Sequence, residues 1–481
     1  MISMPAVPPA FAYGVAAAEV TPSSAVLWTR APHGGAVELQ LGGRWIRLEA
    51  GPATDLTAQV RVRGLRPAMR YTYRFVQGAA TSRTGSFRTA PAPDADATRA
   101  AGSSKPFFNQ FEVYGQMAAE RDDFAVDLGD TIYSDSEVPG SPVARTVPEK
   151  WAKYRQNLAL PALQRLRAAM GVYNEWDDHE FVNDFSRAEF GDALYAAGMR
   201  AFLDYMPATS TNLGLYRTFR WGRNLELFFL DERSFRSAKA SAGGVCDNPP
   251  GTPDIAPTAP AAVRSAFAAL LPALNNPVPA ACLATIADPN RTMLGAAQLA
   301  RFEQDVAAST ATFKVVINEV PLHQFYALPY DRWEGYAAER ARVLQFLQTQ
   351  KNVVILTTDT HADFFGEVRL QTLEPGGPVG TGIDEMVTGP VATGTFAKEI
   401  EGVAGPGSGA VVTALFLKPQ PPRGVGFTCA NTDVFSYVQV HVTSSALTIT
   451  PKDGQGKLVQ DAGLGPCGPF TIPASGPAQA R

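Results

Sequence analysis

The segment NEWDDHEFVND, residues 174–184, gathers five carboxylates, one histidine and two asparagines within eleven residues. If these side chains converge, their mutual repulsion costs free energy unless a cation lies among them. If they face water instead, the run is only the solvated start of a helix. The other polar motifs of the chain decide between a cation site and a solvated helix start.

Two further segments end an apolar run with an acidic residue. FAVDLGD reaches Asp130 and continues as TIYSD, and NVVILTTD reaches Asp359, two residues before His361. The segment AAMGVYNEWDDHE likewise passes from small and apolar residues into Asp178 and His179. Ligands of open α/β folds gather at the carboxyl ends of the strands, so we expect three strand ends to face one crevice. Each segment alone is typical of a simple turn, but the ordered combination predicts a metal site.

The elements that must position these residues change character along the chain. Residues 1–90 contain short β-type runs, and GLRPAMRYTYRFVQG predicts the late strands of a fibronectin/Ig-like β-sandwich with Leu65, Tyr71 and Tyr73 in its core. From Phe107 onward, helical periodicity alternates with fully apolar strands, which predicts an α/β domain with buried sheets. The sequence returns to β character at about Gly405. We therefore expect a β-sandwich over residues 1–90, and over residues 91–481 a layered domain with a β-rich C-terminal tail.

Composition excludes several classes of protein. The 481 residues are 45% hydrophobic and 18% charged, as in an ordinary globular protein. The net charge of −4 and a pI near 5.8 argue against general nucleic-acid binding. No apolar run is long enough to span a bilayer. We expect a monomer that acts on a small molecule.

Four cysteines bear on the compartment of the protein. We favour the pairs Cys246–Cys282 and Cys429–Cys467, because each brackets one irregular Gly/Pro-rich segment. Four cysteines allow three pairings, and four free buried thiols are the alternative. The start, MISMPAVPPAFAYG, lacks the features of a signal peptide, so the protein is either cytoplasmic or shown without a leader. The cysteines favour a secreted or periplasmic protein.

The order GDTIYSD, WDDHEFVNDF, TTDTH resembles the alkaline phosphatase D (PhoD-like) family of metallophosphoesterases. Flanking segments such as FAYGVAAAEVTPSSAVLWTR, LFFLDERSFRS and DEMVTGP resemble it too, so that the likeness covers nearly the whole chain. The resemblance implies a two-sheet metallophosphoesterase core flanked by helices, with a binuclear or larger metal site. It also implies hydrolysis of small phosphate mono- or diesters by a metal-bound hydroxide. Some relatives act as phosphodiesterases or as phospholipase D.

The resemblance also implies roles for single residues. Asp130 is expected to bridge two metals and Tyr133 to bind iron(III), and Asp178 and His179 match the third metallophosphoesterase motif. In the mechanism that we expect, His179 acts as general acid. Asn183 is a further candidate for a ligand or a phosphate contact. The expected metal ligands are Asp130, Tyr133, Asp178, Asp359 and His361.

Arg233, in FFLDERSFR, is expected at a fourth strand end near the crevice. Its guanidinium is suited to hold a non-bridging phosphate oxygen through charge-assisted hydrogen bonds. The alternative is an ion pair with Asp231 or Glu232 that only shapes the fold.

The donor types favour Fe³⁺ and Ca²⁺ as the metals. The chain has only five histidines, two of them in the motifs, whereas carboxylates and a phenolate suit hard cations. Two such ions roughly 3.5–4 Å apart can clamp a phosphoryl group and supply a hydroxide.

One feature of the family pattern is not evident in this sequence. The family domain opens with an apolar strand that ends in a metal-binding Asp or Cys, but only DADATRAAGSS stands before KPFFNQF. Asp94 and Asp96 are the acidic candidates for this first ligand. The sequence therefore leaves open a catalytically impaired homologue that serves only as a binding protein, beside the hydrolase and a phospholipase D-like phosphodiesterase.

Overall fold

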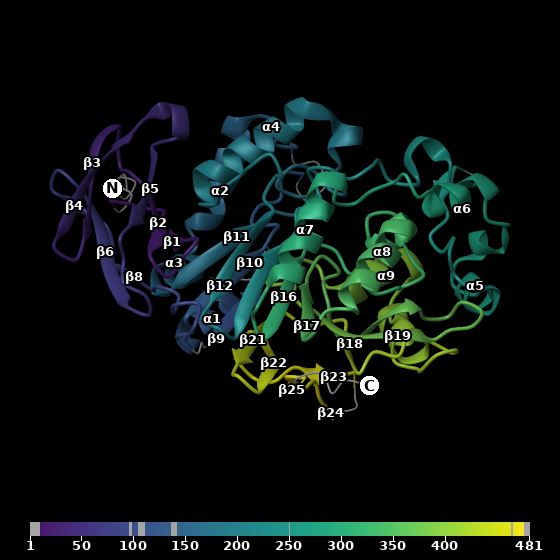
Figure 1. Cartoon of the computed structure of the whole chain (residues 1–481). Helices are drawn as coiled ribbons and strands as arrows, with labels where there is room; N and C mark the ends of the chain where they lie inside the picture. The colour runs from purple at the N-terminus through teal and green to yellow at the C-terminus, as the bar shows by residue number, and fades with distance from the viewer. Residues whose placement is uncertain are drawn as a thin grey trace.

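The computed structural model describes residues 10–95, 99–103, 111–135, 142–249, 251–462 and 465–475. Within these residues, two large β-sheets of nine and seven strands lie at the centre, and helices lie on their outer faces (Figure 1). A five-stranded sheet stands beside them at the N-terminal end of the chain (Figure 1). The predicted layered α/β core with two sheets is confirmed.

The nine-stranded sheet contains the strands that lead to two of the predicted site segments. Its strands β9, β10, β11 and β1 are parallel neighbours. β10 (FAVDL) and β11 (GVYNE) are buried along their whole length, as expected for parallel strands that are covered on both faces. In order across the sheet, the strands are β25 (Phe470–Pro473), β22 (Ala446–Asp453), β21 (Ser436–Val442), β9 (Arg99–Ser103), β10 (Phe124–Leu128), β11 (Gly171–Glu175), β1 (Val15–Ala18), β2 (Ser24–Arg30) and β5 (Thr57–Arg63).

Strand β9 corrects the expectation that no strand precedes KPFFNQF. Its residues, RAAGS, pair in parallel with β10 and antiparallel with β21. A strand inside a sheet needs backbone partners on both edges more than it needs large side chains. Small residues therefore suffice here, and the strand that the apolar-run criterion missed is present.

The seven-stranded sheet carries the third predicted site segment at the end of β17. Strands β13, β16, β17 and β19 are parallel neighbours, and β16 (FKVVIN) and β17 (VVILT) are buried throughout. In order, the strands are β12 (Arg217–Trp221), β13 (Leu225–Phe229), β16 (Phe313–Asn318), β17 (Val353–Thr357), β19 (Val379–Val387), β18 (Asp363–Gln371) and β20 (Cys429–Asn431).

The two sheets pack face to face across one apolar core. Leu128 of β10, Phe229 of β13 and Ile317 of β16 all belong to this core and are at most 2% exposed. Complete burial of one such side chain stabilises the fold by about 1.5–3 kcal/mol. Shared burial of this kind holds the two sheets, and with them the ends of their strands, in a fixed relation.

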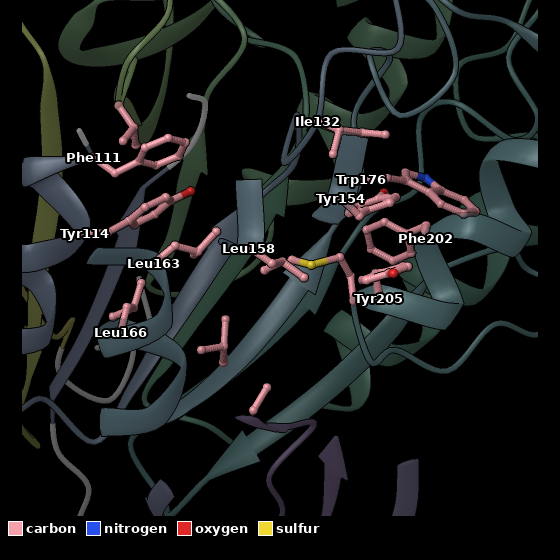
Figure 2. Packing of buried hydrophobic residues seen from close by; sticks show 14 of the residues in the cluster. Phe111, Tyr114, Ile132, Tyr154, Leu158, Leu163, Leu166, Trp176, Phe202 and Tyr205 are labelled. Atoms are coloured by element: carbon pink, nitrogen blue, oxygen red, sulfur yellow. The ribbon is translucent and has the colours of Figure 1, made fainter. Parts of the chain in front are cut away.

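Helices cover the outer face of each sheet. Figure 2 shows the apolar cluster beneath the helices of the nine-stranded sheet, where Tyr154 stacks on Tyr205 with ring centroids 5.3 Å apart. Helix α2 begins at a capping box formed by Thr146 and Glu149. The helices on this face are α1 (Glu112–Glu120), α2 (Val147–Leu158), α3 (Pro161–Ala169) and α4 (Arg187–Tyr205). The seven-stranded sheet packs against α7 (Ala296–Ala308) and α8 (Ala337–Leu347).

The N-terminal region is β-rich, as expected, but it shares a sheet with the rest of the chain. Strand β1 pairs in parallel with β11, with Ala17 opposite Gly171, so that β1, β2 and β5 extend the nine-stranded sheet. Against them packs the five-stranded sheet, and the core between the two includes Leu65 and Tyr73, with Tyr71 at its border. This smaller sheet contains β3 (Gly35–Leu41), β4 (Arg44–Ala50), β6 (Arg70–Gln77), β7 (Ala80–Thr81) and β8 (Gly85–Arg88).

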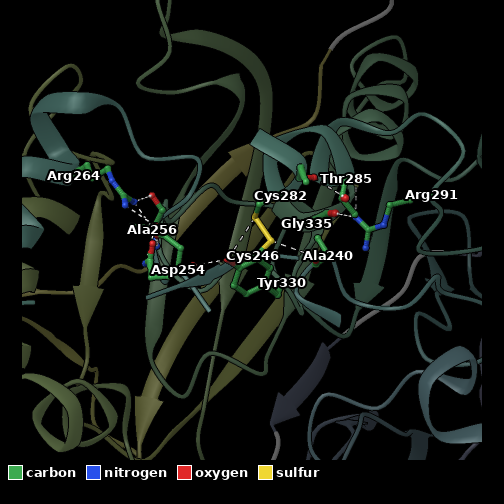
Figure 3. The surroundings of a disulfide bond; sticks show 12 residues. Ala240, Cys246, Asp254, Ala256, Arg264, Cys282, Thr285, Arg291, Tyr330 and Gly335 are labelled. Atoms are coloured by element: carbon green, nitrogen blue, oxygen red, sulfur yellow. Dashed lines mark hydrogen bonds and ion pairs between the residues drawn. A yellow bond between two sulfur atoms is a disulfide. The ribbon is translucent and has the colours of Figure 1, made fainter. Parts of the chain in front are cut away.

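Both predicted disulfides, Cys246–Cys282 and Cys429–Cys467, are present. Figure 3 shows the first, which closes an excursion between β13 and α7. Tyr330 packs against this bridge and donates to the backbone oxygen of Asp254 at 2.5 Å. The excursion contains β14 (Asp247–Asn248), β15 (Thr252–Pro253), α5 (Ala261–Ala268) and α6 (Ala280–Ala287). The second disulfide joins β20 to the segment that follows β23 (Gln460–Asp461) and β24 (Gly465–Pro466).

Helices α9 (Phe396–Ala404) and α10 (Ser408–Val412) follow β19 and meet at a sharp bend. Among the described residues, no single helix is long and apolar enough to cross a membrane. The pair Phe396–Ala404 and Ser408–Leu417, bent by 109°, reaches that length and composition only when counted together.

Candidate metal centre

Three strand ends bring four of the predicted site residues together. One carboxylate oxygen from Asp130, one from Asp178 and one ring nitrogen of His179 lie within 4.8 Å of one another. Oxygens of Asp177, Asp178 and Asp359 form a second group with the same limit. Asp178 belongs to both groups, so ligands that follow β10 and β11 in one sheet meet a ligand that follows β17 in the other.

The backbone at these positions is strained. Asp130, Asp359 and His361 have φ angles of 51°, 66° and 57°, in the left-handed region that favours glycine. Such conformations cost of order 1–3 kcal/mol per residue and concentrate at functional sites. Gly129 has a φ of 99°, and a Cβ built on it would lie 2.6 Å from the backbone nitrogen of Asp177. This glycine therefore permits the close approach of the loops after β10 and β11.

Tyr133 lies beside the first group of ligand atoms. It is 1% exposed, and its hydroxyl donates to Oδ2 of Asp130 at 3.3 Å. Its ring stacks on the imidazole of His179, with centroids 3.9 Å apart and planes 25° apart. The tyrosine oxygen is thus beside the carboxylate that the sequence predicts as the bridging ligand.

His179 is held at both its backbone and its ring. Its backbone N–H donates to Oδ1 of Asp130 at 3.1 Å, and its Nδ1 lies 2.6 Å from Oδ1 of Asp135. Burial opposes protonation of this ring, but the carboxylates of Asp178 and Asp130 and the bond to Asp135 outweigh it and raise the pKa of His179 to about 10. In the absence of metal, this histidine is a cation among carboxylates.

Glu180 holds the two loops that carry the predicted ligands Asp130 and Asp178. Its buried carboxylate accepts from the backbone N–H groups of Asp130 at 3.1 Å, Thr131 at 2.6 Å and Asp177 at 2.9 Å. Burial, with the neighbouring charge of Asp130, raises the pKa of Glu180 to about 8. Glu175 is buried too, and its Oε2 pairs with Arg217 at 2.8 Å. Neither of these two glutamates is a solvated surface charge.

Lys150 of α2 connects the loop after β10 with the loop after β11. Its Nζ donates to Oγ of Ser134 at 2.7 Å and to the backbone oxygens of Glu180 and Phe181 at 2.9 and 3.0 Å. Burial lowers the pKa of Lys150 to about 7. Its distance from the motifs in sequence explains why motif reasoning did not find it.

Arg233 has partners other than those expected. Its guanidinium is fully buried, and Nε donates to Oδ1 of Asp177 at 2.6 Å, while Nη1 contacts both oxygens of Asp331 at 2.9 and 3.0 Å. Nη2 lies 4.0 Å from Oδ1 of Asp359. The bond recorded from Arg233 to Asp231 is that of its backbone N–H, at 3.2 Å, so the guanidinium pairs with Asp177 and Asp331 in place of the alternative partners Asp231 and Glu232.

Asp331 is a site residue that sequence reasoning missed. One of its oxygens lies within 4.8 Å of oxygens of Asp178 and Asp184. Burial would raise its pKa, but Arg233 and Arg236 outweigh burial and keep the pKa of Asp331 below its usual value. It follows no apolar strand, so the strand-end criterion offered no signal for it.

The remaining predicted residues lie at or beyond the border of these groups. His361 is buried, and its Nδ1 lies 2.6 Å from Oε1 of Glu399 in the first turn of α9. Asn183 has an exposed side chain, and its backbone N–H donates to Oδ2 of Asp135. Asp94 is exposed in a turn before β9, at the amino end of that strand and away from the crevice, which excludes it as the first ligand. Asp96 lies outside the described residues.

Comparison with known proteins identifies the family. Residues 98–450 match the family model of the PhoD-like phosphatases. The chain belongs to the PhoD-like phosphatase family. Residues 3–91 match the model of the N-terminal domain of PhoD-like phosphatases.

Individual relatives agree with this membership. Alkaline phosphatase D of Bacillus subtilis (strain 168) is 27% identical over 418 residues, which make up 74% of this chain and 65% of that protein. The solved structure of PhoD superposes with a TM-score of 0.71 at 22% identity and covers 96% of this chain and 90% of its own. A purple acid phosphatase from seeds of yellow lupin (Lupinus luteus) gives a TM-score of 0.56 at 12% identity, over 93% of this chain and 73% of its own. The chain shares its fold with both solved structures.

The donors of this PhoD-like site are suited to hard cations. Each group of ligand atoms is dominated by carboxylate oxygens, the phenol of Tyr133 adds an oxygen beside Asp130, and His179 supplies the nitrogen. Four aspartates, Asp130, Asp177, Asp178 and Asp359, gather beside the positive charges of Arg233 and His179. Bound cations would offset the remaining repulsion.

Proposed function

We propose that the protein is a metal-dependent hydrolase of phosphate esters. The observation that carries this proposal is the position of Asp178, whose carboxylate belongs to two groups of ligand atoms at the meeting point of three strand ends. Membership of the PhoD-like phosphatase family and the similarity to alkaline phosphatase D of Bacillus subtilis support the same chemistry. Strand β9 supplies the strand whose apparent loss suggested an impaired homologue, but its residues, RAAGS, include no Asp or Cys to serve as the first metal ligand of the family pattern.

The proposed metals are Fe³⁺ and Ca²⁺. The residues that would hold them are Asp130, Tyr133, Asp178, Asp359 and His361. When bound, such ions supply a hydroxide nucleophile and stabilise the charge that develops on the phosphoryl oxygens. The phenol of Tyr133 suits iron, whereas the carboxylate-rich second group, around Asp178 and Asp359, suits calcium.

The protein's own residues would bind, orient and donate a proton. His179 is proposed to protonate the leaving oxygen as a general acid. Arg233 was expected to hold a phosphate oxygen, but its guanidinium is fully buried and bonded to Asp177 and Asp331. We assign it the role of orienting these two carboxylates, and direct contact with substrate would require it to give up one of these bonds.

Metal analysis combined with a panel of phosphate mono- and diesters tests the proposal. We expect iron and calcium in stoichiometric amounts, loss of hydrolysis after chelation, and recovery when both ions are restored. A protein that binds both metals fully and hydrolyses no ester in the panel would instead be a binding protein. The ratio of rates for mono- and diesters decides between a phosphatase and a phosphodiesterase, including one of the phospholipase D type.

Location and assembly complete the proposal. The two disulfides support a secreted or periplasmic protein, because such bonds persist in oxidising compartments. We expect a monomer, which light scattering of the purified protein would test.

A further inference from the structure

An apolar groove of about 410 Å³ lies between α5, in the excursion that the first disulfide closes, and the chain that follows α9. Among the described residues that line this groove, all but Arg423 are apolar. Its volume is within the range of about 300–1,000 Å³ that is typical of small-molecule sites, which are mostly apolar with a few polar groups. The groove is separate from the predicted metal ligands, none of which lines it.

Two local features of the sequence leave this space open. Ala262 and Ala266, four residues apart, lie on one face of α5 and present only methyl groups to the groove. On the opposite wall, the backbone N–H of Lys418 donates to the backbone oxygen of Thr413 at 3.1 Å and closes a π-helical turn, Thr413–Leu417. Such turns are rare and are frequently found at functional sites.

The walls of the groove hold large apolar side chains in water. Leu415 of the π-helical turn is 70% exposed, Val411 of α10 is 44% exposed, and Leu270 after α5 is 40% exposed. Deeper in the groove, the rings of Phe267 and Phe416 meet edge to face with centroids 4.9 Å apart and join the two walls. A gathered apolar surface of this kind marks a site that a ligand or a partner covers.

Arg423 provides the charge of the groove. Its side chain is exposed, and its guanidinium makes no ion pair or hydrogen bond with the part of the chain that the structure describes. By contrast, Lys418 pairs with Asp461 at 2.7 Å, on the segment next to the second disulfide. An apolar groove with one uncompensated cation is complementary to a ligand that has an apolar body and one negatively charged end.

We propose that this groove binds a single-chain anionic amphiphile. The alkyl chain would lie between α5 and the π-helical turn, and the carboxylate or phosphate head would pair with Arg423, because a guanidinium forms paired hydrogen bonds with either group. A flat bilayer surface would cover Leu415 without filling the space next to Phe267 and Phe416, whereas one alkyl chain can enter that space. This binding goes beyond the proposed hydrolysis and does not depend on it.

Calorimetric titration of the full chain with octanoate, octyl phosphate and octanol, each below its micelle concentration, tests the site. Both anions should bind more tightly than octanol. Lengthening octanoate to decanoate should tighten binding by about 10- to 20-fold, because each CH₂ removed from water contributes about 4-fold. Arg423→Gln should weaken binding of the anions by about 2- to 5-fold, as expected for an exposed ion pair, and leave octanol unchanged.

Matched variants separate occupation of the groove from general effects on the fold. Ala266→Trp fills the groove and should abolish binding, whereas Ser265→Trp adds the same side chain at a neighbouring exposed position outside the groove and should not. Leu415→Ser is a second groove variant, at a side chain too exposed to support the core. Arg83→Gln, at an exposed position in the N-terminal region, is the control for Arg423→Gln.

Each outcome supports or overturns the inference. Equal affinity for octanoate and octanol would overturn the recognition of an anionic head by Arg423. Binding that persists in both Ala266→Trp and Leu415→Ser would place the ligand elsewhere. Binding to phosphatidylglycerol vesicles but not to monomeric octanoate, or a dimer that Leu415→Ser disrupts, would make the surface a membrane or subunit contact instead. A protein that binds octanoate but hydrolyses no ester would contradict the proposed function and leave this inference intact.

Discussion

The backbone N–H of Asp130 donates a hydrogen bond of 3.1 Å to Oε2 of Glu180. The same carboxylate also accepts from Thr131 and Asp177, so one buried side chain holds the loop after β10 against the loop after β11. Because both loops carry predicted ligands, the spacing of the metal centre depends on a residue that need not touch a metal.

The variant Glu180→Ala should therefore lower stability as well as activity. Three buried backbone N–H groups would lose their acceptor, and each orphaned group costs about 1–3 kcal/mol. We expect the free energy of unfolding to fall by about 3 kcal/mol or more, measured by urea denaturation. Glu149→Ala is the matched control, because Glu149 also accepts two backbone N–H bonds but does so at an exposed helix start. An equal loss in both variants would show that Glu180 has no special structural role.

Tyr133→Phe should bleach the metal-loaded protein. A phenolate bound to iron(III) gives a charge-transfer band in the visible region, and this change removes only the oxygen. The ring should keep its stacking on His179, so stability should change little. Tyr154→Phe, in the apolar cluster under α2, should keep the colour. Full iron content without a visible band in the unmutated protein would exclude Tyr133 as a ligand.

Asp130→Asn should be more damaging to activity than Tyr133→Phe. A neutral amide neither offsets the charge of two cations nor bridges them as a carboxylate does. Mutation of a residue that hydrogen-bonds to a metal ligand typically lowers metal affinity or activity by about 10- to 100-fold. Loss of a bridging ligand itself should therefore lower kcat by more than about 100-fold. Metal content should fall in parallel, which elemental analysis would measure. Retained activity together with full metal occupancy in Asp130→Asn would exclude Asp130 as a metal ligand.

His323 should make the protein less stable in acid. Burial, together with Arg340, lowers the pKa of His323 to about 3, and the unfolded chain titrates near 6.5. Between these values the unfolded state binds the extra proton, so the free energy of unfolding falls as the pH decreases, by up to about 1.4 kcal/mol per pH unit. In His323→Gln, urea midpoints between pH 6.5 and 4 should depend less steeply on pH. His33→Gln, at an exposed position, should leave the slope unchanged, and parallel slopes in all three proteins would contradict the assignment.

The parts of the site that followed strands were predictable from the sequence. Asp130, Asp178 and Asp359 each come shortly after a buried apolar run, and parallel strands bring their carboxyl ends to one side of the molecule. The cysteine pairs were predictable for a related reason, because each brackets a single irregular segment. In both cases the pattern along the chain is local, and topology brings the pieces together.

The features that the sequence did not predict depend on contacts between segments that are distant in the sequence. Strand β9 has no apolar run, and its strand conformation comes from β10 and β21 on either side. Asp331 and Lys150 come from segments outside the motifs and reach the site only after the sheets and helices have packed. Such contacts produce no periodic pattern within a single segment, so the sequence alone did not predict them.

The pairing of β1 with β11 also has a consequence for how the chain is made. The ribosome releases β1 long before β11, so the N-terminal strands emerge while one edge of their sheet still has no neighbour. An open edge of this kind is a site for wrong pairing between nascent chains. The edge of β1 can therefore pair with β11 only after synthesis has passed residue 175, and until then it is open to pairing with other chains. Cleavage of the N-terminal region from the finished protein would instead expose the edge of β11 to which β1 is paired.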